Sequence, residues 1–123
     1  MTRSLPPCRR TPNCVSTQTD DPGKLMEPIP YSGPLAAARE RLVAVLRALP
    51  RTRIVLEEPG YLKAECRSRL FRFVDDVDLL FDDQAKLIHF RSAARLGRRD
   101  FGVNRERMEE IRRRFQRRGQ ETG

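Results

Sequence analysis

Apolar residues recur at helical spacing between residues 35 and 49 of this chain. Leucine, alanine and valine stand there at three- and four-residue intervals, which place them on one side of a helix, and three arginines lie off that side. Ser32 is a capping candidate, a proline follows it in the first turn, and Pro50 ends the stripe. The pattern therefore predicts a helix over residues 35–49.

A second helical stripe lies near the C-terminus. Met108, Ile111 and Phe115 recur at intervals of three and four residues, and Asn104 precedes them as a candidate cap. Gly119 is a natural stop for such a helix. We therefore expect a helix over residues 104–117 and a disordered tail over residues 119–123.

Between the two stripes the pattern changes to short β-type runs, which predict two hairpins. The runs cover residues 53–57, 61–67, 77–82 and 86–92. Pro59-Gly60 separates the first two and suits a type II turn, while Asp82–Ala85 separates the last two. The stretch 68–76 either extends the third strand through a bulge or forms a loop.

The first 33 residues show neither period. They contain eight prolines or glycines, and proline lacks the amide hydrogen that a helix or a central strand needs. We expect an irregular proline-rich arm over residues 1–33, whose end Met26, Ile29 and Tyr31 could pin to the core.

These elements predict the fold class. A chain of 123 residues supports one domain with one modest core. We expect a single α+β domain over residues 34–118, in the order α-β-β-β-β-α. It would have an antiparallel sheet of about four strands, with both helices packed on one face.

The formal net charge of +8 is concentrated near the C-terminus. Residues 91–118 hold eleven basic and four acidic residues, so +7 of the charge belongs to them. A basic surface attracts phosphates, anionic lipids or acidic proteins. The alternative is a solvated charged helix with no ligand.

This basic segment holds the strongest candidate site, for an anion. A strand end, a glycine-containing loop and a helix N-terminus meet there, and amides and arginines bind anions well. The candidate residues are Arg91, Ser92, Arg95, Arg98, Asn104 and Arg105. The alternative is that aspartates neutralise these arginines, and we expect structural ion pairs among Arg67, Arg72, Asp75 and Asp76.

Other chemistries find little support. The single histidine, His89, has no predictable nucleophile beside it, so no catalytic residue is assigned. Asp75, Asp76 and Asp78 do not all point the same way on a strand, and no glycine-bearing loop accompanies them, so we assign no metal. Glycine-rich phosphate loops are absent, which leaves no cofactor implied and makes nucleic acid the weaker choice of partner.

Cys8 and Cys14 could close a small loop as a disulfide in an oxidising compartment. The first residues lack an apolar leader, and no apolar run reaches the roughly 20 residues of a membrane span. On this reading the chain is cytoplasmic with reduced thiols. Cys66, on a β-type run, is expected to be a small buried hydrophobe.

Three motifs in order resemble the bacterial and plastid family called domain of unknown function 1499. They are PNCVSTQ at 12–18, LFRFVDDVDLLFD at 70–82 and RSAARLGRRDFGVNRERMEEIR at 91–112. The resemblance implies a compact α+β domain and carries no established activity. The family includes exported and lumenal members, so it implies an extracytoplasmic location as the alternative. Arg98-Arg99 stand where Tyr-Ser is common, which makes this chain more basic than the pattern.

The sequence favours a non-enzymatic binding or accessory domain with an arginine-rich, anion-facing loop and helix. One alternative is an enzyme for a phosphorylated or carboxylated substrate that uses Asp75 or Asp76 with Arg91. Another is a structural module for a protein partner. A cleft that holds Asp76, Arg91 and His89 would favour the enzyme, and a flat basic face would favour binding.

Overall fold

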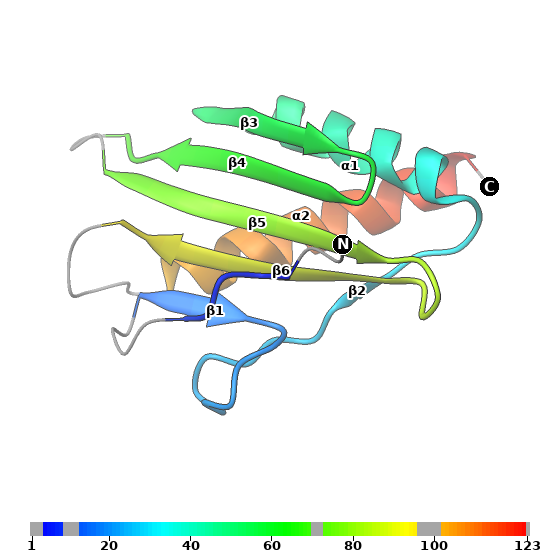
Figure 1. Ribbon diagram of the computed structural model, residues 1–123. Coiled ribbons are helices and arrows are strands. Elements are labelled where there is room, and N and C mark those ends of the chain that lie inside the picture. Colours follow the sequence, from blue (N-terminus) through cyan, green and yellow to red (C-terminus); the bar gives the residue numbers. More distant parts are fainter. Residues whose placement is uncertain (1–3, 9–12, 70–72, 96–101, 123) are drawn as a thin grey trace.

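The protein, described by a computed structural model over residues 4–8, 13–69, 73–95 and 102–122, has two layers. One layer is a six-stranded antiparallel sheet, and the other consists of two helices on a single face of that sheet (Figure 1). The opposite face is called the helix-free face below. Residues 4–8 lie in front of it (Figure 1).

The elements follow one another in a simple order along the chain. They are β1 (Cys14–Ser16), β2 (Ile29–Pro30), α1 (Leu35–Ala48), β3 (Thr52–Glu58), β4 (Tyr61–Arg67), β5 (Val74–Asp82), β6 (Leu87–Ala94) and α2 (Val103–Thr122). In the sheet the strand order is β1-β6-β5-β4-β3, and β2 also pairs with β6. The four long strands β3 to β6 thus form three consecutive antiparallel pairs.

The predicted α+β class and both predicted hairpins are confirmed, but the sheet has six strands rather than four. Residues 68–76 were expected to extend a strand or to form a loop, and residues 74–76 belong to strand β5. The first hairpin turns at Pro59-Gly60 as predicted. Its type was predicted wrongly, because a type II turn needs a positive φ at Gly60 and this glycine does not have one.

The two additional strands come from the N-terminal 33 residues. The prediction of an irregular arm agrees with most of the described part of that segment, but it is wrong for Cys14–Ser16 and Ile29–Pro30. Cys14–Ser16 pairs with one end of β6, and Ile29–Pro30 pairs with the other end. Both are very short, and they satisfy amides and carbonyls along β6 that would otherwise stay unpaired at a sheet edge. Met26, Ile29 and Tyr31 are buried, as predicted.

Helix α2 runs through residues 119–122, which corrects the prediction of a disordered tail there. Gly119 is not a stop but a contact point. A Cβ at this position would lie 2.7 Å from Nη1 of Arg41 on α1, so a larger residue here would displace the end of that arginine side chain. At the other end, the carbonyl of Gly102 accepts the first helical hydrogen bond, from Glu106. Asn104 therefore lies inside the first turn instead of capping it.

The core lies between the sheet and the helices. Leu42 and Leu46 of α1 and Ile111 and Phe115 of α2 face the buried side chains of β4, β5 and β6. Cys66 belongs to this core, as expected, and its burial raises the pKa of its thiol. Among the described residues, no helix is long and apolar enough to cross a membrane.

Candidate functional site

Alternation along the strands sends one set of charged side chains to the helix-free face. The register places Lys63 of β4, Asp78 of β5 and Arg91 of β6 in one row across three neighbouring strands. The next row contains Glu65 and Asp76. Because adjacent strands lie about 4.8 Å apart, each row brings its side chains within reach of one another.

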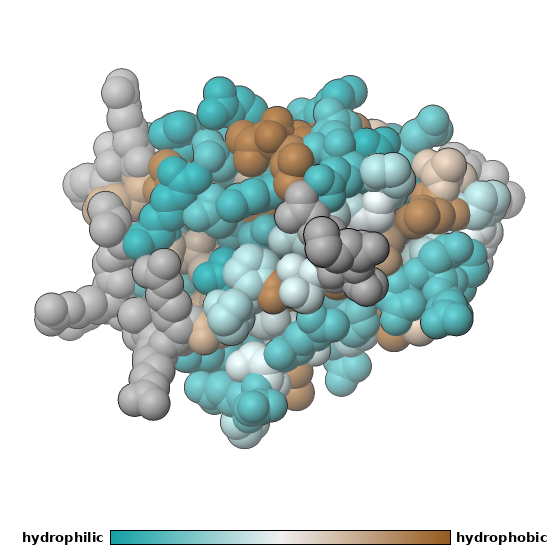
Figure 2. Space-filling view, viewed as in Figure 1, coloured by the Kyte–Doolittle hydropathy of each residue, from teal (hydrophilic) through white to brown (hydrophobic). Residues whose placement is uncertain are grey.

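These rows form one side of a cavity of about 360 Å³, called the sheet-face cavity below. The N-terminal segment forms its other side. The cavity is lined by Pro6, Cys14, Lys63, Asp76, Asp78, Arg91, Ala93, Ala94 and Arg95. In Figure 2, which views this face, most of the surface is hydrophilic. The cavity is of a size that holds a small ligand.

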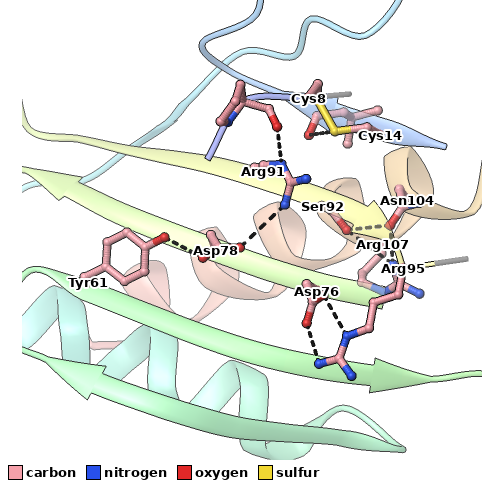
Figure 3. Close-up of polar contacts among 12 residues, drawn as sticks. Cys8, Cys14, Tyr61, Asp76, Asp78, Arg91, Ser92, Arg95, Asn104 and Arg107 are labelled. Atoms are coloured by element: carbon pink, nitrogen blue, oxygen red, sulfur yellow. Dashed lines mark hydrogen bonds and ion pairs between the residues drawn. A yellow bond between two sulfur atoms is a disulfide. The ribbon is translucent and has the colours of Figure 1, made fainter. Parts of the chain in front are cut away.

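Asp78 is the most buried charged group of the sheet-face cavity, with 2% of the residue exposed. The Tyr61 hydroxyl donates a hydrogen bond to Oδ2 of Asp78. The second oxygen, Oδ1, lies 3.9 Å from Nη1 of Arg91 and accepts no hydrogen bond from the residues that the structure describes. Tyr61 and Arg91 thus approach the carboxylate from two sides (Figure 3), and one buried acceptor remains open.

Arg91 is itself held from the other side. Its Nε donates to the carbonyl of Pro7 at 3.2 Å, and 12% of its side chain is exposed. The N-terminal segment is further tied to β1 by a disulfide between Cys8 and Cys14, whose Cα atoms are 5.8 Å apart. The Cys8–Cys14 pair therefore takes the bonded form that the sequence left open, and it holds Pro6 and Pro7 beside the cavity.

Arg95 forms the second ion cluster of this face. Nε and Nη2 of Arg95 each lie 2.9 Å from an oxygen of Asp76, and Nη2 also lies 2.6 Å from Oε2 of Glu65. Burial acts to raise the pKa of Asp76, but the hydrogen bonds and charge of Arg95 outweigh it, so that this pKa is lowered. Arg95 and both its partners are thus already matched within the fold.

Lys63 differs from the two arginines of the cavity. In the described part of the chain its ammonium group makes no hydrogen bond and no ion pair within 4.0 Å. It does attract Asp76 at longer range, since its charge lowers the pKa of that carboxyl. Lys63 therefore offers three donors to whatever occupies the cavity.

The opposite face of the sheet holds a separate buried network at the start of α2. The Ser92 hydroxyl donates to Oδ1 of Asn104 at 2.7 Å, and Nδ2 of Asn104 donates to the carbonyl of Asn13 at 3.2 Å. Arg107 donates to the same Asn104 oxygen at 2.7 Å (Figure 3). It also donates to Oδ2 of Asp75 at 2.7 Å. This network docks α2 on β1, β5 and β6.

Two further arginines of α2 bind main-chain carbonyls of the N-terminal segment. Arg105 donates to the carbonyls of Gly23 and Leu25 at 3.1 and 3.4 Å. Arg112 donates to the carbonyls of Glu27 and Pro28 at 2.5 and 3.1 Å. The basic residues of the C-terminal segment thus hold the loop between β1 and β2.

The structure does not bring the predicted anion-binding residues together. Arg91 and Arg95 line the sheet-face cavity, Ser92 and Asn104 lie in the network on the opposite face, and Arg105 binds loop carbonyls. Successive strand residues point to opposite faces, which separates Arg91 from Ser92. Arg98 lies outside the described residues, so its part of the prediction has no structural counterpart here.

Asp75 and Asp76 form ion pairs as predicted, but with other arginines than those predicted. Asp76 pairs with Arg95, and Asp75 pairs with Arg107, at 2.9 and 2.7 Å. Arg67 instead lies 3.7 Å from Glu65, its neighbour two positions along β4. Arg72 lies outside the described residues.

His89 lies on the helix-free face but does not line the sheet-face cavity. Its Nδ1 is 3.0 Å from the Thr17 hydroxyl, and the histidine pairs across the strands with Leu80. Asp75, Asp76 and Asp78 do not converge, and no metal-binding cluster of carboxylates, cysteines or histidine occurs among the described residues.

Sequence reasoning missed three residues that matter in these two sites, which are Tyr61, Lys63 and Arg107. Asp78 was considered as a metal ligand and as a partner of neighbouring arginines, but not as part of a binding site. Strand alternation alone could have placed Lys63 and Asp78 on faces of their strands. The register between β4, β5 and β6 was needed to place them in one row with Arg91.

A family model described as protein of unknown function (DUF1499) matches residues 4–115 of the chain. The match includes every strand and most of α2, and it confirms the resemblance read from the three motifs. No curated protein and no solved structure matches the chain. The geometry of the two sites is therefore the basis for a functional conclusion.

Proposed function

We propose that this chain, which belongs to the DUF1499 family, is a binding domain that takes up a small anionic ligand in the sheet-face cavity. The observation that carries the proposal is Lys63. It lines the cavity and makes no hydrogen bond or ion pair in the described part of the chain. A half-buried ammonium group without a partner is stabilised when an anion reaches it.

The balance of charge around the cavity supports an anion rather than a cation. Arg95 is matched by Asp76 and Glu65, and Arg91 has Asp78 at 3.9 Å. Of the described residues that line the cavity, Lys63 then remains as the positive charge without a close counterpart. Arg91 adds guanidinium donors beyond the Nε group that binds Pro7.

The same geometry favours binding over catalysis by the residues considered for an enzyme. Both oxygens of Asp76 accept hydrogen bonds from Arg95, and Asp75 pairs with Arg107 on the opposite face from Arg91. Neither carboxylate is placed to exchange a proton with a ligand in the cavity. His89 does not line the cavity, so the combination that would favour an enzyme is incomplete.

The test is calorimetric titration of the full chain with inorganic phosphate and with citrate. We expect saturable binding of at least one of them, and a loss of affinity of tenfold or more in Lys63→Met. Arg117→Gln is the matched control, because it removes one exposed positive charge from the far end of α2. Equal affinity in wild type and Lys63→Met, or no binding of either anion, would overturn the proposal.

We also propose that the chain works in an oxidising compartment, the location that the family resemblance offered as the alternative. The Cys8–Cys14 disulfide supports this, because such bonds persist mainly outside the cytoplasm. The test is rapid acid quenching of cells and alkylation of free thiols under denaturing conditions, which expose the buried Cys66, followed by mass spectrometry of the isolated protein. Modification of Cys66 alone is expected, and three modified cysteines would contradict it.

A further inference from the structure

Resting on the proposed function, we infer that Asp78 makes the sheet-face cavity selective for a phosphate group that carries a proton. The ligand class is inorganic phosphate or a phosphate monoester. Sulfate and phosphodiesters, whose oxygens carry no proton near neutral pH, would be rejected. Lys63 and Arg91 would bind the anionic oxygens, and Asp78 would accept the ligand's P–OH hydrogen.

The starting observation is the open acceptor on Asp78. Asp78 is 2% exposed and lines the cavity, and within the described part of the chain no group donates a hydrogen bond to its Oδ1. A buried carboxylate oxygen without a donor costs free energy, and a donor supplied by the ligand would recover it. An anion that brings only lone pairs would instead face the carboxylate with like charge.

The neighbours of Asp78 hold this acceptor in place. The Tyr61 hydroxyl occupies Oδ2, so Oδ1 is the oxygen left for a ligand. Arg91 stands 3.9 Å from Oδ1, too far for a hydrogen bond, and its Nε is held by the carbonyl of Pro7. A ligand oxygen at Oδ1 can therefore meet Arg91 at the same time.

The row of residues across the sheet explains how one tetrahedral group can meet all three. Lys63 and Arg91 pair with Asp78 from either side, on the two strands that flank β5. Each flanking strand is about 4.8 Å away, and both side chains are long enough to lean toward the centre. A single phosphate above Asp78 thus has cationic donors on two sides and one acceptor below.

The two kinds of protonated phosphate differ in a way that can be measured. A monoester loses its last P–OH at a pKa of about 6, whereas the dianion of inorganic phosphate still carries one. The affinity for methyl phosphate should therefore fall as pH rises from about 5 to about 8. The affinity for inorganic phosphate should change far less, and dimethyl phosphate should not compete at any of these pH values.

The deciding experiment titrates wild type and Asp78→Asn with inorganic phosphate and sulfate, with the fold of each checked by circular dichroism. Wild type should prefer phosphate by at least tenfold. Asp78→Asn should bring the ratio close to one, mainly by admitting sulfate. A wild type that binds both anions equally, or a variant that keeps the preference, overturns this inference and leaves the proposed function standing.

Two further outcomes distinguish a failure of the proposed selectivity from a failure of the proposed anion binding. If neither anion binds wild type, the proposed function fails and the selectivity falls with it. If Asp78→Asn does not fold, the pH series with methyl phosphate on wild type decides. An affinity for methyl phosphate that does not fall with rising pH, or that dimethyl phosphate matches, contradicts the role of Asp78.

Discussion

Asp75, Asp76 and Asp78 lie within four positions of β5, yet each meets a different arginine. Asp75 pairs with Arg107 on the helix side, while Asp76 and Asp78 lie near Arg95 and Arg91 on the helix-free face. The alternation of side chains along a strand produces this division. Among the described residues only Asp78 keeps a buried side-chain oxygen without a hydrogen bond, which is why the proposed selectivity rests on it.

The Arg95 cluster makes the fold sensitive to acid. Hydrogen bonding to Arg95 lowers the pKa of Glu65 below its usual 4.5, and it lowers the pKa of Asp76 below 3.8 despite burial. When a folded-state pKa is lowered, the unfolded chain binds more protons in acid. The stabilising contribution is therefore present above the unfolded pKa and is lost as pH falls through the folded one.

Arg95→Gln should weaken that dependence. We expect the melting temperature of wild type to fall as pH is lowered from about 5 to about 2, and to fall less in the variant. At neutral pH the variant should melt at a lower temperature than wild type, since Asp76 loses its partner. Thermal melts followed by circular dichroism measure both. Parallel pH curves for the two proteins would show that Arg95 does not set these pKa values.

Arg107→Met tests the network that docks α2. The change removes hydrogen bonds to Ser92 and Asn104 and leaves Asp75 without its arginine, at a site where 17% of the Arg107 side chain is exposed. We expect the free energy of unfolding to fall by about 3 kcal/mol, because a poorly solvated charge stays behind.

Urea unfolding measures the effect of Arg107→Met. Arg113→Met is the matched control, because Arg113 pairs with Glu110 on the exposed side of the same helix. The control should change stability little. If the two variants are equally stable, the network contributes nothing beyond a surface ion pair.

For single residues, the sequence could predict which face of the sheet a side chain occupies, but not which residue it pairs with. Alternation correctly placed Asp76 and Asp78 on one face and Asp75 on the other. The choice of Arg107 for Asp75 depends on where α2 docks, 32 residues further along the chain. Asn104 was read as a cap from local pattern, but its side chain is used by Ser92 and Arg107 instead.

Among the elements, β1 and β2 are strands because they pair with β6, which is distant in the sequence, and not because of a local sequence pattern. Neither Cys14–Ser16 nor Ile29–Pro30 has strand periodicity, and prolines surround both. Their hydrogen-bond partners lie on β6, about sixty to eighty positions away in the sequence. The helices and β3 to β6 were predictable because their periods and turns are local.

The disulfide should contribute to the stability of this N-terminal region. Replacing both cysteines, Cys8→Ser with Cys14→Ser, should lower the free energy of unfolding by about 2 kcal/mol, the loop-closure value for so short a loop. Guanidinium unfolding of the oxidised wild type and the double variant measures this. Reduced wild type is the control and should match the variant, while a variant as stable as the oxidised protein would contradict the prediction.

For the whole molecule, the charge of +8 does not produce a uniformly basic face. Most described arginines of the C-terminal segment are used internally, on carboxylates, on loop carbonyls or on neighbouring turns of α2. Examples are Arg95, Arg105, Arg107, Arg112 and Arg114. Many of the arginines that make the sequence basic therefore form the hydrogen bonds and ion pairs that hold the N-terminal segment and α2 in place.

The candidate site could be predicted only in part for the same reason. Arg91 and Arg95 were found because the charge of the segment points to them. Lys63 stands in a stretch whose charges cancel, and nothing local marks it out. The sheet-face cavity exists because β4, β5, β6 and the tethered residues around Pro6 meet on one face, which is a property of the assembled fold.

The central claim is that an anion binds on the helix-free face and not on the arginines of α2. Amide chemical-shift mapping with isotope-labelled protein and inorganic phosphate tests it most directly. The largest shifts are expected in β4, β5 and β6 around Lys63, Asp78 and Arg91. Largest shifts instead in α2 around Arg117 and Arg118, with the strands unmoved, would contradict the account.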